Sequence, residues 1–164
     1  MVRTLSDDER PATPASREKS WMTVEDNERI DFLLDRISKR LDKVERHGRR
    51  KGAHLAILVA IRNLFNAISD DIDSVCIFLD RHGLLKDEPT TNEHSKTRPM
   101  RIDTDHRQLL KVCGAAIGLR TRSDIRDSVI LTGALMLLDQ SPMDVLQHTT
   151  DDLHIGVPKN IFRP

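Results

Sequence analysis

Seven histidines, two cysteines and a cluster of aspartates are the residues whose types could support catalysis or metal binding. The histidines show no metal-ligand spacing, and Cys76 and Cys113 form no CxxC pair. The acids of 70–73 are explained by a helix start, where the helix dipole favours negative charge. No phosphate-binding glycine loop and no nucleophile motif is found. We therefore expect no enzyme activity, no cofactor and no metal, with surface histidines and both cysteines buried as small apolar side chains.

Charge is the second feature with chemical meaning, because its distribution is uneven although the formal net charge is zero. Residues 36–51 hold eight Lys or Arg against two acids, and residues 96–126 hold eight against three. Only charges near the phosphates matter for a polyanion, so a neutral chain with two basic segments can still bind one. The first segment lies on the polar face of an expected helix, where it would contact phosphates, support self-association or remain a solvated face.

Composition favours a mainly helical fold. Aromatic residues are only 3% of the chain, so the core must be aliphatic, and a β-sandwich or barrel is disfavoured. Residues 1–22 are polar and contain two prolines, which predicts a disordered arm without a signal peptide. The longest apolar run is far shorter than the roughly 20 residues of a membrane span. We expect a chain that stays in a reducing cytoplasm and does not enter the membrane.

The N-terminal half predicts a helical hairpin over residues 23–85. Thr23 precedes acids and would cap a first helix, whose apolar residues recur at spacings of three, four and seven up to Val44. A second helix is expected from about 53 to 69 and, after a cap or kink at 69–71, on to Arg81, with Gly83 as its C-cap. This hairpin would provide dimer or partner contacts.

Residues 86–98 are polar and contain a proline, so they predict a linker between two units. The second unit, 99–147, is expected to fold as a helix-turn-helix-like pair, followed by a tail over 148–164 and with no internal repeat in the chain. The turn would fall at Gly118 and Leu119, after a helix ending at Ile117, and the next helix would be capped by Thr121 or Ser123.

A short extended segment precedes this helix pair. Met100 and Ile102 alternate with polar neighbours, so they would face a core while Thr97 and Arg101 face outward. Asp103 to Asp105 would cap the helix that follows. The alternative is that 100–102 form a loop and that the unit is a plain helical hairpin in an all-α bundle.

The order strand, helix, turn and helix, together with the turn sequence GLRTRSDIRDS, resembles the ribbon-helix-helix family of DNA-binding proteins over residues 97–139. The resemblance implies that two chains each give one strand to a ribbon in the DNA major groove, and that the second helix points its N-terminus at a phosphate. It implies a homodimeric transcriptional repressor or an accessory factor of plasmid DNA processing. The implied DNA-binding residues are Thr97, Arg98, Arg101, Arg120, Arg122, Ser123 and Arg126, with Arg101 reading bases.

A second function remains open beside DNA binding. The wide apolar arcs of residues 55–79 and 125–138 would also suit a helical adaptor or regulatory subunit that buries them against a partner helix and binds no nucleic acid. The state of residues 98–103 discriminates between the two, because a strand pair formed between two chains favours the first function and a mobile loop favours the second.

Overall fold

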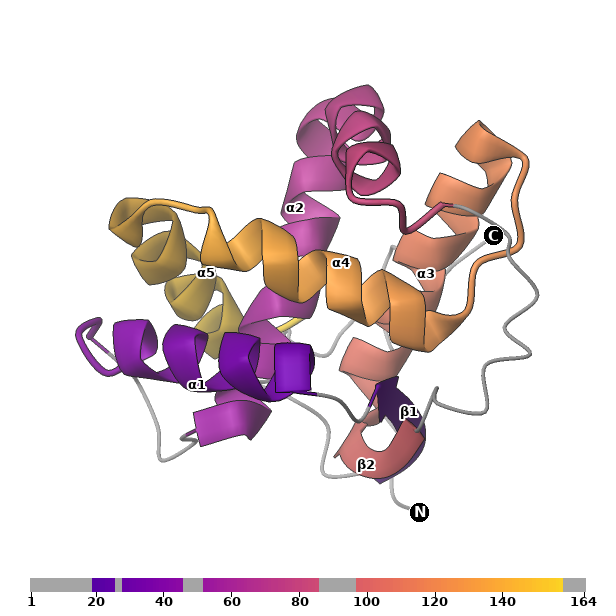
Figure 1. The fold of residues 1–164 in the computed structure, drawn as a ribbon. Helices are drawn as coiled ribbons and strands as arrows, with labels where there is room; N and C mark the ends of the chain where they lie inside the picture. The colour runs from indigo at the N-terminus through magenta and orange to yellow at the C-terminus, as the bar shows by residue number, and fades with distance from the viewer. Residues whose placement is uncertain (1–18, 26–27, 46–51, 86–96, 158–164) are drawn as a thin grey trace, which may run out of the picture.

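The fold is mainly helical with one small sheet, as the composition predicted. The computed structural model describes residues 19–25, 28–45, 52–85 and 97–157. Seven elements follow one another along the chain (Figure 1). They are β1 Lys19–Glu25, α1 Glu28–Leu41, α2 Gly52–Arg81, β2 Thr97–Asp103, α3 Thr104–Thr121, α4 Asp127–Asp139 and α5 Met143–Ile155.

The sheet is an antiparallel pair of strands formed within one chain. Lys19 lies opposite Asp103, Met22 opposite Met100 and Glu25 opposite Thr97. The strand predicted around Met100 and Ile102 is therefore real, and the loop alternative is wrong. The resemblance implied a strand from a second chain, but the partner of β2 here is β1, which lies in the region expected to be an arm and a helix start.

The misreading of β1 has a local cause. The run from Thr23 to Asp26 has the residue types of a helix N-terminus, yet Thr23 lies in the strand and α1 begins at Glu28. Met22 and Val24 are buried at 4% and 1% exposure, which is the period-two pattern of a half-buried strand. Burial of these two side chains against the helices favours the extended conformation over the helical one.

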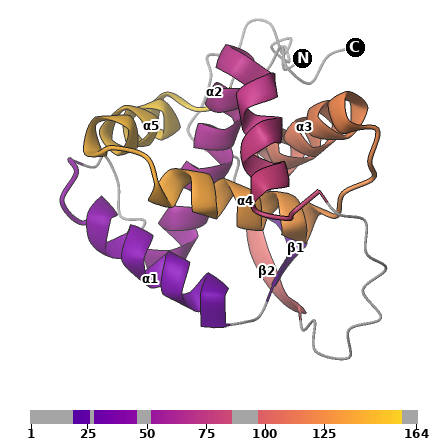
Figure 2. The same ribbon diagram turned by 45° about the horizontal axis from the view of Figure 1, so that its top comes forward.

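One hydrophobic core holds all the helices together, so the two predicted units do not pack separately. α2 packs against α3 and α4 across the predicted boundary, and β1 packs against α4. In Figures 1 and 2, α1 and α3 lie on opposite sides of the crossed pair α2 and α4. The segment Ala56–Ile61 of α2 is fully buried, together with Ala134 and Leu135 of α4. The apolar arcs assigned to a partner protein are thus largely used inside this chain.

Arginines on the polar face of α1 also contribute to this packing. Arg40 donates hydrogen bonds to the carbonyl oxygens of Asp139, at 2.7 Å, and Ser141, while Arg36 pairs with the Asp139 carboxylate at 3.0 Å. The last carbonyl groups of a helix lack intrahelical donors, so these arginines supply bonds at the C-terminus of α4. Lys39 differs, because it is 75% exposed and pairs with Asp35 one turn earlier in the same helix.

α2 is kinked at Asp71, as the sequence suggested. Asp71 has non-helical backbone angles, and its carboxylate accepts hydrogen bonds from the backbone N–H of Asp73 and from Ser74. The bonds from Ser74 lower the pKa of Asp71.

By length and composition alone, the 30-residue helix α2 could cross a membrane, which the sequence did not predict. However, 56% of its most apolar window is buried in the fold, as in the core helix of a soluble protein.

The connection between α3 and α4 differs from the predicted one. Gly118 and Leu119 lie inside α3, which continues to Thr121, and α4 begins only at Asp127 with Arg126 at its N-cap position. Thr121 is therefore not a cap, because its hydroxyl donates back to the carbonyl of Ile117. The helix ends at Arg122, whose left-handed backbone allows the N–H groups of Arg122 and Ser123 to bond to the carbonyl of Gly118.

Gly118 is needed for a close approach rather than for a turn conformation. A Cβ atom there would lie 2.8 Å from the carbonyl oxygen of Ser123, whereas a Cβ on Gly114 would meet Ile130 at an ordinary 3.6 Å. We expect Gly118→Ala to lower the free energy of unfolding by about 1–3 kcal/mol, as overpacking does. Gly114→Ala in the same helix is the control, and it should be neutral or stabilising. Urea denaturation of both variants checks this, and equal effects would contradict it.

The C-terminal boundary was also predicted wrongly. The expected tail over 148–164 includes most of α5, which runs to Ile155 and packs against α2 and α1. Residues 158–164 lie outside the described part of the chain. Leu146, which is fully buried, and Thr149 fix α5 on the core.

Candidate nucleic-acid interface

The two-stranded sheet is called the ribbon below, and its outer face carries Arg101 of the predicted set together with Trp21. Arg101 in β2 is exposed, and Trp21, its partner across the ladder in β1, is 60% exposed. The Arg101 guanidinium carbon lies 5.6 Å from the centre of the Trp21 ring, a cation–π distance. The pair places an aromatic plane and a forked cation side by side on the ribbon.

The inner face of the ribbon fixes these two side chains relative to the fold. Met22, Val24 and Ile102 are buried and hold both strands on the helices. Outward and inward side chains alternate along a strand, so anchoring of the even positions forces Trp21 and Arg101 outward. The sequence predicted Arg101 and Ile102 in these orientations.

A buried polar pair fixes the end of β2. The Asp103 carboxylate accepts a hydrogen bond from the backbone N–H of His106 at 3.0 Å and lies 2.6 Å from its ring Nδ1. Asp103 thus caps α3, as expected, but His106 is 1% exposed and not the surface histidine that was predicted. The pair joins the ribbon rigidly to the first turn of α3 and has no access to solvent.

The other predicted contact residues form two groups, one near the ribbon and one at the far end of α3. This helix leads away from the ribbon for 18 residues, and the segment 122–126 returns along it so that α4 begins on the ribbon side (Figures 1 and 2). Arg126 is exposed at the start of α4. Thr97 and Arg98 are the first two residues of β2, and the structure describes their backbone but not their side chains.

Arg120, Arg122 and Ser123 lie at the far end of α3. Arg120 pairs with Asp73 of α2 at 2.6 Å, and this carboxylate raises the pKa of the arginine. The Ser123 hydroxyl donates to the carbonyl of Thr121 at 3.4 Å, while Arg122 is exposed at the helix end. A shallow depression of about 650 Å³ next to Arg122 is also lined by Asp124 and Asp127, so its charge is mixed. The structure therefore does not bring these residues to the ribbon.

Trp21 is the residue of this surface that the sequence analysis missed. Met22 docks on the helices, while Trp21 faces outward. The signal was available in the alternation Trp-Met-Thr-Val, which is the pattern of a half-buried strand. Its strand partner, however, is far away in the sequence.

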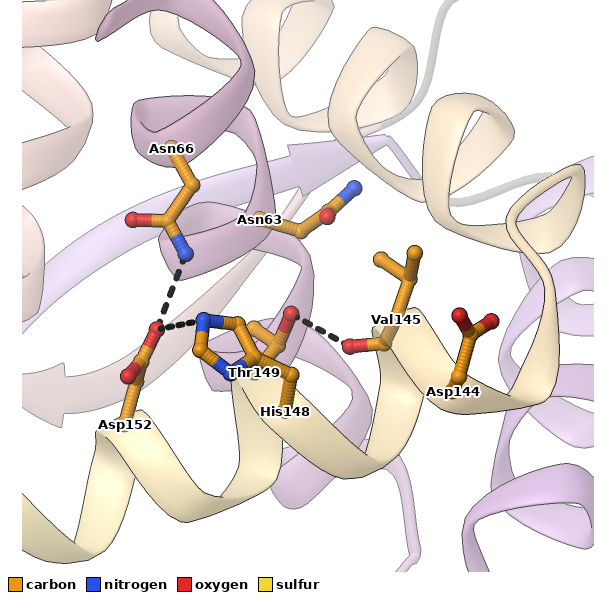
Figure 3. Close-up of a pocket in the computed structure, with 7 residues that line it drawn as sticks. All are labelled: Asn63, Asn66, Asp144, Val145, His148, Thr149 and Asp152. Carbon is orange, nitrogen blue, oxygen red and sulfur yellow. Dashed lines mark hydrogen bonds and ion pairs between the residues drawn. The ribbon is translucent and has the colours of Figure 1, made fainter. Parts of the chain in front are cut away.

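A second polar depression, of about 400 Å³, lies between α2 and α5 (Figure 3). The Asn66 amide donates to the Asp152 carboxylate at 3.0 Å, and His148 lies 3.6 Å from the same carboxylate. Asn63 also lines it. Asp152 is thus already held by two side chains, and the arrangement ties α5 to α2. Among the residues that the structure describes, no three His, Cys, Asp or Glu side chains could together hold a metal ion.

The two cysteines differ in exposure, although both were predicted to be buried. Cys113 is 1% exposed, and its burial raises the pKa of the thiol to about 12, whereas Cys76 is only half-buried. The thiolate is the reactive form, so Cys113 should be inert in the folded protein. We expect iodoacetamide at pH 8 to modify Cys76 first and Cys113 only after unfolding, as followed by mass spectrometry. Equal rates without denaturant would contradict the burial of Cys113.

Comparison with protein-family models, with curated proteins and with solved structures finds no match to this chain.

Proposed function

We propose that this protein binds double-stranded DNA by placing the outer face of the ribbon in the major groove. The observation that carries the proposal is an antiparallel strand pair that is anchored in the core on one face and presents Trp21 and Arg101 on the other. The major groove is wide enough for a two-stranded ribbon, and its base edges are distinguishable by hydrogen bonds. The proposed role is that of a repressor or of an accessory factor in plasmid DNA processing, in the cytoplasm.

Each side chain has a proposed role that follows from its chemistry. Arg101 forms a bidentate pair with a guanine edge, the commonest specific contact of this residue. Trp21 offers an apolar plane to a thymine methyl group and holds the arginine fork in position. Arg126 contributes to a phosphate contact at the start of α4, where the first N–H groups of the helix lack intrahelical acceptors. Thr97 and Arg98 flank these contacts from the start of β2.

The two arginines at the far end of α3 have different roles in this proposal. Arg120 is paired with Asp73, so its role is to hold α3 on α2. Arg122 and Ser123 lie where a backbone phosphate would pass only if the duplex bent around α3. Neutral net charge agrees with a narrow contact surface, because bulk attraction to DNA is then small.

The experiment is fluorescence-anisotropy binding to duplex DNA across a salt series, first with random sequence and then with a site selected from a randomised library. We expect the affinity to fall steeply with salt, since phosphate contacts release counterions. Arg101→Ala should cost about 1–3 kcal/mol on the selected site and much less on random DNA. Arg101→Lys keeps the charge but loses the forked guanidinium group. It should therefore retain binding to random-sequence DNA and lose the preference for the selected site.

Lys39→Ala is the matched control, because it removes one exposed cation from α1 that pairs with Asp35 of the same helix. It should leave both affinities nearly unchanged. Equal losses for Arg101→Ala on every sequence would contradict base reading. No binding at low salt would reject the proposal and favour the function of a helical adaptor or regulatory subunit.

A further inference from the structure

We infer that this single chain is an internally duplicated ribbon-helix-helix unit, and that it recognises a non-palindromic DNA site as a monomer. The DNA part of the inference rests on the proposed function. The chain runs strand, helix, helix twice, as β1-α1-α2 and then β2-α3-α4. In the homodimer expected from the sequence, a second chain would supply the second strand of the ribbon. Here the first half of the same chain supplies it.

The strand pair has the geometry of two equivalent halves. Both strands contain seven residues and are paired along their full length, so the first residue of each lies opposite the last residue of the other. The middle residues, Met22 and Met100, lie opposite each other. An approximate two-fold axis through this Met–Met pair relates β1 to β2.

The helices follow the same approximate two-fold symmetry as the strands. α1 and α3 follow their strands and flank the central crossed pair formed by α2 and α4 (Figure 2). Each first helix also packs on the second helix of the other half, α1 on α4 and α3 on α2. The two halves are therefore interlocked across the axis, as two chains would be.

Two ion pairs, one on each side of the axis, tie the two halves together. Arg36 of α1 binds Asp139 at the last residue of α4, at 3.0 Å. Arg120 of α3 binds Asp73, just after the kink at Asp71 where the first straight segment of α2 ends, at 2.6 Å. Both contacts join Nε of an arginine on a first helix to an aspartate on the second helix of the other half, but Arg36 lies in the middle of α1 and Arg120 in the last turn of α3. These contacts hold the interlocked halves together, whereas the axis itself is defined by the strand register and the order of the helices.

The repetition is inexact, which explains why the sequence analysis found no repeat. Ten residues separate α1 from α2, but only five separate α3 from α4, and α2 continues beyond its kink. Corresponding positions also carry different residues. Trp21 and Pro99 are the third residues of their strands, and Thr23 and Arg101 are the fifth.

These differences decide the kind of DNA that fits. Two identical chains present the same side chains to both halves of a site and therefore read palindromes. Here the described outer positions differ, with Trp21 in one strand and Pro99 at its equivalent in the other, both exposed. The preferred duplex should accordingly have two unlike half-sites and bind one copy of the chain.

The test has one arm with DNA and one without. In the DNA arm, a site is selected from a randomised library, and the molar mass of the complex is measured by light scattering. We expect a non-palindromic site bound by one 18.7 kDa chain, and Arg101→Ala should relax preference on one side of the site only. A palindrome bound by two chains, with preference relaxed symmetrically, would overturn the inference and leave DNA binding intact.

The DNA-free arm tests whether one chain forms the ribbon by itself, and its result does not depend on DNA binding. The double variant Trp21→Cys/Arg101→Cys places two thiols on directly opposite ladder positions, where a disulfide can form. We expect oxidation to give a monomeric, intrachain cross-link mapped by peptide mass spectrometry. The single variants are the controls and should give none. A covalent dimer between position 21 of one chain and position 101 of another would overturn the single-chain ribbon.

Discussion

Leu135→Ala should lower the free energy of unfolding by about 2–5 kcal/mol, the usual cost of deleting a large side chain from a packed core. Leu135 lies in α4 and is fully buried in the same cluster as Leu58 and Ile61 of α2. The cavity would therefore form where both halves of the chain meet. We expect a single cooperative transition in urea, with helical circular dichroism and Trp21 fluorescence shifting together to a lower midpoint.

The control for this variant is Leu119→Ala, which makes the same chemical change at a side chain that is 84% exposed. Its effect should stay within about 0.5 kcal/mol. The signal of Trp21 is informative because this is the only tryptophan and it reports on the ribbon. Two separate transitions, with the ribbon signal unaffected by Leu135→Ala, would mean that the halves fold independently and would contradict the shared core.

The second large effect is expected from Arg40→Ala, which should destabilise the protein by about 1.5–3 kcal/mol. Arg40 is half-buried and donates to carbonyl oxygens of Asp139 and Ser141, so it stabilises the C-terminus of α4 from the other half of the chain. Loss of the guanidinium leaves those carbonyl groups without their charged donor. Thermal and urea unfolding of the variant measure the effect.

Lys39→Ala serves again as the control, because Lys39 is the adjacent residue of α1 and carries the same charge at 75% exposure. Exposed ion pairs such as Lys39–Asp35 contribute little, so this variant should change stability by less than about 1 kcal/mol. Arg40→Lys tests the geometry, since an ammonium group cannot reach several carbonyl oxygens as the fork does. Equal stability of all three variants would show that the contacts at the end of α4 contribute nothing.

The parts of the fold that could be predicted are those set by local pattern. Alternation around Met100 and Ile102 predicted β2, Asp103 supplied a recognisable cap for α3, and the acids near Asp71 marked the kink. β1 was missed because the residues after Met22 also have the composition of a helix start. Pairing with the distant strand β2 and burial of Met22 and Val24 against the helices make the extended form favourable, and the sequence near Met22 does not reveal those distant contacts.

The ends of α3 and α4 show the same limit. Gly118 was interpreted as a turn because glycine commonly ends helices, whereas the structure uses it to admit the carbonyl group of Ser123. The residue that adopts the left-handed conformation is Arg122, which no local preference would select. Periodicity located the helices but not the residues at which they end.

The candidate interface could be predicted in part. Arg101 was placed outward by the alternation, and the structure agrees. Arg120 was assigned to DNA from its position in the turn sequence, but its partner Asp73 lies on another helix. Likewise, the sequence left open whether the basic face of α1 is solvated or binds DNA. The structure shows that Arg36 and Arg40 of this face contact the end of α4.

A titration of the protein with duplex DNA that follows the fluorescence of Trp21 shows directly whether DNA binds at the ribbon. Because Trp21 is the only tryptophan and lies exposed on the ribbon beside Arg101, a duplex seated there must change its signal. We expect a saturable change in fluorescence at low salt that matches the anisotropy curve and disappears as salt is raised. DNA binding by anisotropy with an unchanged Trp21 signal would contradict the ribbon as the binding surface.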